Sequence, residues 1–175
     1  MTLKSQHAKK PIELSNPLHL LATGFGSGMF YWMPGTVGSL VAILLWFLLL
    51  SFLPWPLDLL VVILSIFLGI YVCHHTACDI GVHDHSCIVW DEFIGMWLTL
   101  IALPRNDWRW VITGFLLFRF LDIWKPWPIS WLDRKVQGGI GIIIDDVVAS
   151  MIAAGILILL HTSGCFLSET LTKDL

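Results

Sequence analysis

The stretch Ile140–Leu160, "IGIIIDDVVASMIAAGILILL", surrounds two adjacent carboxylates with apolar residues over the length of a long helix. About 20 predominantly apolar residues are enough for an α-helix to cross the hydrocarbon core of a bilayer. Small residues recur along the stretch at i, i+4 spacing, which lets membrane helices approach each other closely. These residues are Ala149, Ser150, Ala153 and Ala154. The stretch therefore predicts a membrane-spanning helix packed against other helices, with Asp145 and Asp146 in its first turns.

The whole chain has the composition of an integral membrane protein. Of its 175 residues, 57% are hydrophobic and 13% are charged, and the mean hydropathy is +0.80. Soluble domains contain about 25% charged residues. We expect an all-α fold, a polytopic membrane helix bundle with about four to five membrane segments. Its expected parts are a cytoplasmic or interfacial N-terminal segment at 1–36, a membrane helical domain at 37–161 and a tail at 162–175.

Five apolar segments of unequal length make up the predicted bundle. Val37–Leu53, Leu57–Val72 and Ile140–Leu160 are expected to span the membrane, whereas Phe93–Leu103 and Trp110–Phe118 are short. The longer of these two has 11 residues, about 16 Å as a helix, which is roughly half of what a bilayer requires. The short segments therefore either lie inside the bundle or form a re-entrant hairpin.

Basic residues set the expected orientation of these segments. The polar N-terminus lacks the apolar core of a signal peptide, so we expect the first span to be an uncleaved anchor. Lysine and arginine are enriched both in this N-terminus and in the loop at 125–135, which the positive-inside rule assigns to the cytoplasm. The polar segments 24–39, 74–92 and 122–146 should then meet at one cytoplasmic face.

Acidic residues gather in two of these polar segments. The first group lies in "HDHSCIVWDEF", His83–Phe93, and the second is the pair inside the last span. Acids in a first helical turn can simply stabilise the helix dipole, but carboxylates buried in a span are costly without a cation. Carboxylates from different helices form the hard-oxygen ligand set that Mg²⁺ shares with water and substrate phosphate. The predicted metal ligands are Asp84, Asp91, Glu92, Asp145 and Asp146.

Two further motifs are candidates for holding a phosphate. "PGTVGS", Pro34–Ser39, places the hydroxyls of Thr36 and Ser39 at the start of a helix, where backbone N–H groups and the helix dipole suit an anion. An ordinary helix start would have the same residues. The motif contains neither a Walker pattern nor a G-x-G-x-x-G, so it is a weak signal by itself.

"FRFLDIWKPWP" spaces Arg119, Asp122 and Lys125 at i, i+3 and i+6. Arg119 and Lys125 are candidates for binding a phosphate, and Asp122 for a base or a further metal ligand. The alternative is a structural ion pair between Arg119 and Asp122 at the membrane interface.

Taken together, five segments resemble the phosphatidylglycerophosphatase A family: "GFGSG", "PGTVGS", "IVWDEFIGMW", "FRFLDIWKPWPI" and "GGIGIIIDDVVAS". The match runs in order over about residues 16–155 and is similar to bacterial inner-membrane members. Several segments in a fixed order are far more specific than any one of them. No segment departs from the family's pattern.

The resemblance implies a Mg²⁺-dependent enzyme that removes the terminal phosphate of phosphatidylglycerophosphate to give phosphatidylglycerol. It implies a multi-pass protein of the bacterial inner membrane whose site faces the cytoplasm, with a phospholipid as its partner. The net charge of −3, with the acids gathered in a few segments, argues against a nucleic-acid partner. Asp91 and Asp122 are then expected to be catalytic. The nucleophile is either water activated by the metal or an aspartate that is transiently phosphorylated. The functional positions that the resemblance implies in this chain are Asp84, Asp91, Glu92, Arg119, Asp122, Lys125, Asp145 and Asp146.

Two other classes of function remain to be weighed. Intramembrane acids also mark ion paths, so a small ion-coupled transporter or channel is the main alternative. Its acids would be spread through the depth of the bilayer. A structural membrane subunit, whose acids only cap helices, is the second alternative.

Overall fold

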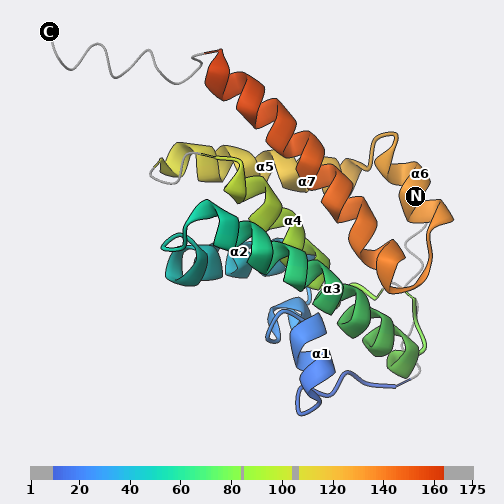
Figure 1. Ribbon diagram of the computed structural model, residues 1–175. Helices are drawn as coiled ribbons and strands as arrows, with labels where there is room; N and C mark the ends of the chain where they lie inside the picture. Colours follow the sequence, from blue (N-terminus) through green and yellow to red (C-terminus); the bar gives the residue numbers. More distant parts are fainter. Residues whose placement is uncertain (1–9, 84, 104–106, 164–175) are drawn as a thin grey trace, which may run out of the picture.

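A computed structural model describes residues 10–83, 85–103 and 107–163, and over these residues the protein is helical, with no β-strand. Figure 1 shows the helices gathered into one bundle, with the long α7 crossing it. The elements are α1 (Pro17–Ala22), the 3₁₀ turn η1 (Ser27–Met29), α2 (Pro34–Leu45), the π-helical turn η2 (Trp46–Leu50), α3 (Trp55–Ile80), α4 (Trp90–Ile101), α5 (Trp108–Trp124), α6 (Ile129–Lys135) and α7 (Gly138–Thr162).

Two of the described helices, α3 and α7, are long and apolar enough to cross a membrane, with 26 and 25 residues. The run α2–η2, Pro34–Leu50, is apolar but shorter. By length and composition the structure therefore supports two of the four to five predicted membrane segments. Of the two segments predicted to be short, α4 is a short helix of 12 residues, whereas α5 has 17 residues and extends beyond the predicted Trp110–Phe118 at both ends.

The helix α3 is longer than the apolar pattern of its sequence predicted. The predicted span ended near Val72, but α3 continues through the polar residues that follow, up to Ile80. It ends at Gly81, which adopts φ 71° and donates its N–H to the carbonyl of Ala77. A helix satisfies its own backbone whatever its side chains are, so hydropathy marks where lipid contact ends rather than where the helix ends.

The helix α4 lies at the centre of the bundle and contacts α2, α3, α5 and α7. The ring of Trp90 stacks on that of Phe93, with centroids 5.5 Å apart. Further along α4, Trp97 donates its indole N–H to the carbonyl of Ala42 in α2 at 2.9 Å. The backbone N–H of Val89, just before α4, donates to Ala22 in α1. These contacts hold the first turn of α4, with its two acids, in a fixed place.

The small residues of α7 are packed as the sequence predicted. Ala149, Ser150 and Ala153 have no exposed surface. On the facing helix, a Cβ added at Gly95 would lie 2.5 Å from the ring of Phe118 and 3.4 Å from the backbone oxygen of Asp146. Because α4 and α7 approach this closely, the carboxylates of both helices come together.

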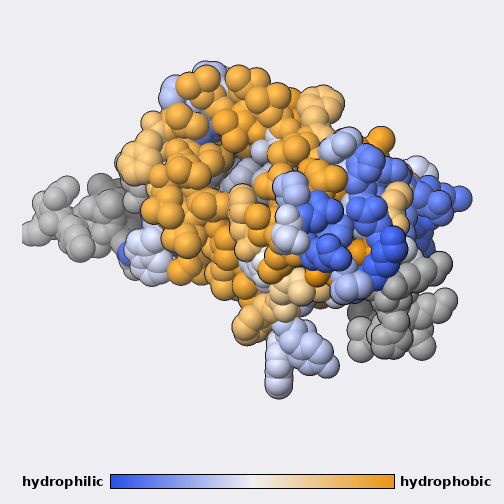
Figure 2. Space-filling view, turned by 90° about the horizontal axis from the view of Figure 1, so that it is seen from below, coloured by the Kyte–Doolittle hydropathy of each residue, from blue (hydrophilic) through white to orange (hydrophobic). Residues whose placement is uncertain are grey.

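Hydrophobic side chains cover much of the outer surface. Figure 2 shows them over most of the face seen from below, while hydrophilic side chains gather at the end where α3 ends and α7 begins. The outward residues of α2, α3, α5 and α7 include many large exposed hydrophobic side chains. The bundle thus has an apolar body and one polar end.

Candidate active site

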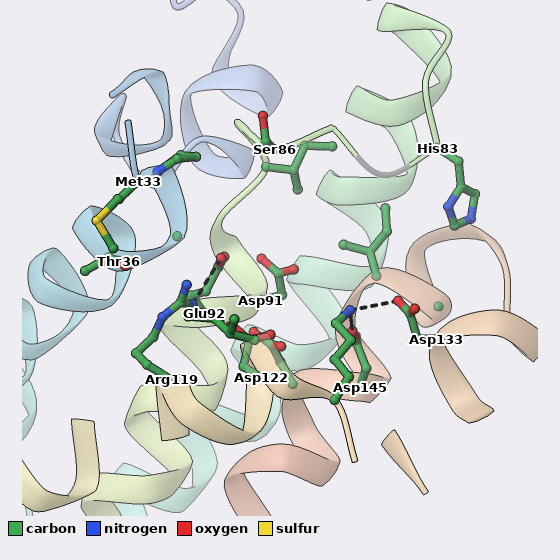
Figure 3. A pocket seen from close by; sticks show the side chains of 18 residues that line it. Met33, Thr36, His83, Ser86, Asp91, Glu92, Arg119, Asp122, Asp133 and Asp145 are labelled. Atoms are coloured by element: carbon green, nitrogen blue, oxygen red, sulfur yellow. Dashed lines mark hydrogen bonds and ion pairs between the residues drawn. The ribbon is translucent and has the colours of Figure 1, made fainter. Parts of the chain in front are cut away.

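A pocket of about 790 Å³ lies where the starts of α2, α4 and α7 meet the end of α5. Figure 3 shows Met33, Thr36 and Arg119 on one side of this pocket and His83, Asp133 and Asp145 on the other. Residues from all three predicted polar segments line it. The expected convergence of these segments is therefore seen in the structure.

Three carboxylates from two helices form the acidic centre of the pocket. Asp91 and Glu92 lie in the first turn of α4, and Asp146 lies in the third turn of α7. One oxygen from each of the three lies within 4.8 Å of the other two. Their buried oxygens Asp91 Oδ1, Glu92 Oε2 and Asp146 Oδ2 have no hydrogen-bond partner among the described residues.

This carboxylate group fits a divalent cation of the hard, oxygen-preferring kind. Mg²⁺ takes oxygen ligands and usually one or two carboxylates, with water and phosphate completing its shell. Buried carboxylate oxygens without partners are costly, and a cation among them would offset that cost. Asp91, Glu92 and Asp146 are the residues that would hold it.

Burial and mutual repulsion also alter the protonation of this group. Burial, followed by the charges of Glu92 and Asp146, raises the pKa of Asp91 well above its usual range. Burial likewise raises the pKa of Glu92, although the nearby Arg119 opposes the change. A proton or a metal ion is therefore favoured at the start of α4.

Arg119 in α5 supplies the first cation of the pocket. Its Nη1 lies 2.7 Å from Oδ2 of Asp122, one turn further along the helix, and 3.5 Å from Oε1 of Glu92. The first turn of α2 closes over this group: a Cβ added at Gly35 would overlap the carboxylate of Glu92 and lie 2.9 Å from the guanidinium. Only a residue without a side chain leaves room for the Arg119–Glu92 pair.

Lys125 supplies the second cation. It ends α5 in the left-handed conformation, with φ 45°, and its Nζ lies 2.5 Å from Asp145 Oδ2 and 2.8 Å from Asp133 Oδ1. Burial lowers the pKa of Lys125, but the two carboxylates outweigh burial and raise it above its usual value. The ammonium group therefore stays charged and ties α5 to α6 and α7.

The predicted site residues divide into those that line this pocket and those that do not. Lining it are Thr36, Asp91, Glu92, Arg119, Asp122, Lys125, Asp145 and Asp146. Asp145 is paired with Lys125 and is not a member of the three-carboxylate group. Ser39 is fully buried inside α2, does not line the pocket and donates its hydroxyl to the carbonyl of Gly35 at 2.9 Å. Asp84 lies outside the described residues.

Two titratable residues that line the pocket, Asp133 and His83, were not among the predicted set. Asp133 comes from α6, a helix of seven residues that no apolar pattern marked. His83 accepts the backbone N–H of Gly138 through Nε2 at 2.6 Å and so connects the segment before α4 to the start of α7. In the sequence, the only available signal was their position beside the polar motifs.

Cleavage of a phosphate ester requires fixed cations around the transferring group, and here two cations and a carboxylate group face one pocket of a helical bundle. This is the arrangement of a helical phosphatase. The family model described as phosphatidylglycerophosphatase A matches residues 20–161. The chain belongs to the phosphatidylglycerophosphatase A family, and it is an enzyme of the phosphatase class.

Curated relatives extend over nearly the whole chain. The phosphatidylglycerophosphatase A of Escherichia coli (strain K12) is 62% identical over 160 residues, which cover 90% of this chain and 92% of the relative. The phosphatidylglycerophosphatase A of Haemophilus influenzae is 50% identical over 144 residues, which cover 82% of this chain and 88% of the relative. No solved structure matches this chain.

Proposed function

We propose that this protein hydrolyses the terminal phosphate of phosphatidylglycerophosphate to give phosphatidylglycerol, with Mg²⁺ as its cofactor. The observation that carries the proposal is the meeting of Arg119, Lys125 and the carboxylates Asp91, Glu92 and Asp146 in one pocket. Relatives that share most of the chain carry the name of this activity. The substrate is a phosphate monoester on a lipid headgroup, which matches a charged pocket on an apolar bundle.

The side of the pocket that carries Arg119 is proposed to bind the phosphate. Arg119 presents its guanidinium to the non-bridging oxygens, and Asp122, at 2.7 Å from Nη1, holds that guanidinium in place. The hydroxyl of Thr36 and the first backbone N–H groups of α2 lie on the same side, where a helix N-terminus favours an anion. Lys125 adds charge from the opposite side.

The acidic group holds the metal. Asp91, Glu92 and Asp146 provide its protein ligands, and Asp145 keeps Lys125 directed at the pocket. When bound, Mg²⁺ neutralises charge on the phosphate and lowers the pKa of a water molecule. Attack of water on phosphorus breaks the bond to the lipid oxygen, which leaves as the alcohol with a proton, and releases inorganic phosphate.

Water rather than an aspartate is the proposed nucleophile. Asp122 and Asp145 are ion-paired with Arg119 and Lys125, and ion pairing makes a carboxylate a weaker nucleophile. Asp91 and Asp146 are the proposed metal ligands. Acid quenching during turnover is accordingly expected to trap no phosphorylated protein, and a trapped aspartyl-phosphate would contradict this step.

The site is proposed to face the cytoplasm from a multi-pass bundle in the bacterial inner membrane. The helices α3 and α7 provide two crossings, and the polar end of the bundle holds the pocket. The shorter helices α4 and α5 are proposed as a re-entrant pair buried against α7. The positive-inside rule favours this orientation.

The arrangement of acids favours an enzyme over a transporter. The acids of α3, Asp58 and Asp79, lie near its two ends, and those of α7 are confined to Asp145 and Asp146. Between the ends of these two helices there is no series of acids along the bundle axis. An ion path through the bilayer would require such a series.

The direct test is a phosphatase assay with the purified protein. Long-chain phosphatidylglycerophosphate in mixed micelles is expected to yield equal amounts of inorganic phosphate and phosphatidylglycerol, in the presence of Mg²⁺ and not after chelation. The absence of phosphate release from protein that unfolds cooperatively on heating would overturn the proposed function. Phosphate release that persists after chelation would overturn the proposed role of Mg²⁺ but not the proposed phosphatase activity.

A further inference from the structure

The pocket has an apolar side in addition to its charged centre. Met33, the residue before α2, and Ile123, in the last turn of α5, both line the pocket and are 55% and 59% exposed. Two large hydrophobic residues that face both a polar pocket and the outside are unexpected in an enzyme for a water-soluble phosphate ester. Both residues therefore lie at the margin where the pocket meets the apolar surface of the bundle.

This margin continues into an apolar stripe on α5. Ile112, Leu116, Phe120 and Ile123 recur at i, i+4, i+8 and i+11, which places them on one helical face, and all four are exposed. The stripe runs away from the pocket along the outer side of the bundle. Because Ile123 is its last residue, the stripe and the pocket wall share a side chain.

This margin lies on the side of the pocket where the phosphate is proposed to bind. Figure 3 shows Met33 on the same side as Arg119, with Asp133 and Asp145 across the pocket. A ligand whose phosphate contacts Arg119 would therefore extend its remaining part past Met33 and Ile123. The exposed polar residues His83 and Asp133 border the other side.

The chain just before Met33 supports a lipid environment at this margin. Phe30, Tyr31 and Trp32 are exposed one after another, Trp32 to 84%. Exposed aromatic residues of this kind are enriched at membrane–water interfaces, where their rings lie at the headgroup level. Because this segment leads directly into Met33, we expect this margin of the pocket to lie near the membrane–water interface.

We propose that Met33 and Ile123 form a lateral opening through which the acyl-glycerol part of the lipid substrate leaves the pocket and lies along the α5 stripe, while its phosphate contacts Arg119. The inference rests on the proposed function and adds the residues that select a membrane-held substrate. Released phosphate would leave on the opposite side, past His83 and Asp133.

The test compares variants at the opening with matched controls. Ile123→Asn is paired with Leu64→Asn, an exposed hydrophobic residue of α3 that neither lines the pocket nor belongs to the stripe, and Met33→Gln is paired with Met29→Gln, which is exposed but does not line the pocket. Each variant is assayed with long-chain phosphatidylglycerophosphate in mixed micelles. Inorganic phosphate is added as a product inhibitor to measure binding at the charged centre alone.

The expected result is a KM for the lipid that rises about tenfold for Ile123→Asn and Met33→Gln, since about 1.4 kcal/mol of apolar contact corresponds to a factor of ten. The inhibition constant of inorganic phosphate should stay within twofold of the wild type, and both controls should match the wild type. An unchanged KM in both opening variants, or an inhibition constant that rises in parallel with KM, would overturn the opening while leaving the phosphatase intact. A wild-type protein that releases no phosphate would instead overturn the proposed function and the opening with it.

Discussion

Nη1 of Arg119 lies 3.5 Å from Oε1 of Glu92, so a cation at the end of α5 and an anion at the start of α4 meet beneath the first turn of α2. The side chains of both residues are largely buried, with 12% and 13% exposed. This pair joins the proposed phosphate-binding side of the pocket to its proposed metal-binding side. The contact can be tested from both sides, at Arg119 itself and at Gly35 above it.

Replacing Arg119 by lysine should lower kcat/KM by about 100-fold, the scale of losing one fixed donor to a developing charge. A lysine keeps the charge but presents a single ammonium, which cannot contact Asp122 and Glu92 as a planar fork does. Steady-state kinetics on the purified variant provides the measurement. Arg134→Gln is the control because Arg134 is exposed and donates to Ser130 within its own helix. A variant Arg119→Lys with normal kinetics would remove Arg119 from phosphate binding.

Gly35→Ala should reduce activity more than it reduces stability. The atoms that a Cβ would meet are the far ends of Glu92 and Arg119, which can move aside without unfolding the helix but then leave their present positions. We expect kcat/KM to fall by at least about tenfold, equivalent to 1.4 kcal/mol, with a nearly unchanged melting temperature. Gly155→Ala is the matched control, since a Cβ there meets nothing within 4 Å. Equal activity of the two variants would show that the contact at Gly35 has no role in the site.

Metal affinity should increase with pH. The raised pKa of Asp91 means that its carboxyl retains a proton to higher pH than an ordinary aspartate, and a metal ion must displace that proton. As pH rises through this pKa, the metal-free protein should lose stability and Mg²⁺ should bind more tightly. The melting temperature with and without Mg²⁺, measured from acidic to alkaline pH, follows both effects. A stabilisation by Mg²⁺ that is independent of pH would contradict the assignment of Asp91 as a ligand.

Lys125 and Asp145 should be energetically coupled. Lys125→Met leaves the buried carboxylate of Asp145 without its cation, whereas the double variant Lys125→Met/Asp145→Asn removes the charge as well. The double variant should therefore be less destabilised than the sum of the single ones, by about 1 kcal/mol or more. Thermal or denaturant unfolding in detergent supplies the three values. Additive effects would mean that the 2.5 Å contact contributes nothing to stability.

The composition and the order of motifs were enough to predict the helical class, the family and most of the charged residues that line the pocket. Asp145 and Asp146 stood out because carboxylates inside an apolar span are costly, and Arg119, Asp122 and Lys125 stood out through their helical spacing. Hydropathy located the two longest helices, α3 and α7, because a helix that crosses a bilayer needs about 20 apolar residues. These are the features that a bilayer imposes on a sequence.

What the sequence did not predict depends on contacts between distant segments. Asp133 joins the site only because α6 folds back onto α7, and nothing in its own sequence neighbourhood indicates this contact. Ser39 and Thr36 looked equivalent, yet Thr36 lies in the first turn of α2 and lines the pocket, whereas Ser39, one turn further along the helix, is buried and donates to the carbonyl of Gly35. Met33 and Ile123 were hidden among many apolar residues, and only their shared pocket distinguishes them.

The measurement that tests the central claim most directly is Mg²⁺-dependent phosphate release from phosphatidylglycerophosphate by the wild type and by the folded variants Asp91→Asn and Asp146→Asn. The two aspartates come from different helices and belong to one carboxylate group, so both variants should lose at least about 100-fold in kcat/KM, the effect of removing a fixed electrostatic contact. Asp79→Asn, exposed near the end of α3 and outside the pocket, should retain normal activity. Near wild-type turnover in either Asp91→Asn or Asp146→Asn would contradict a single active site built from α4 and α7.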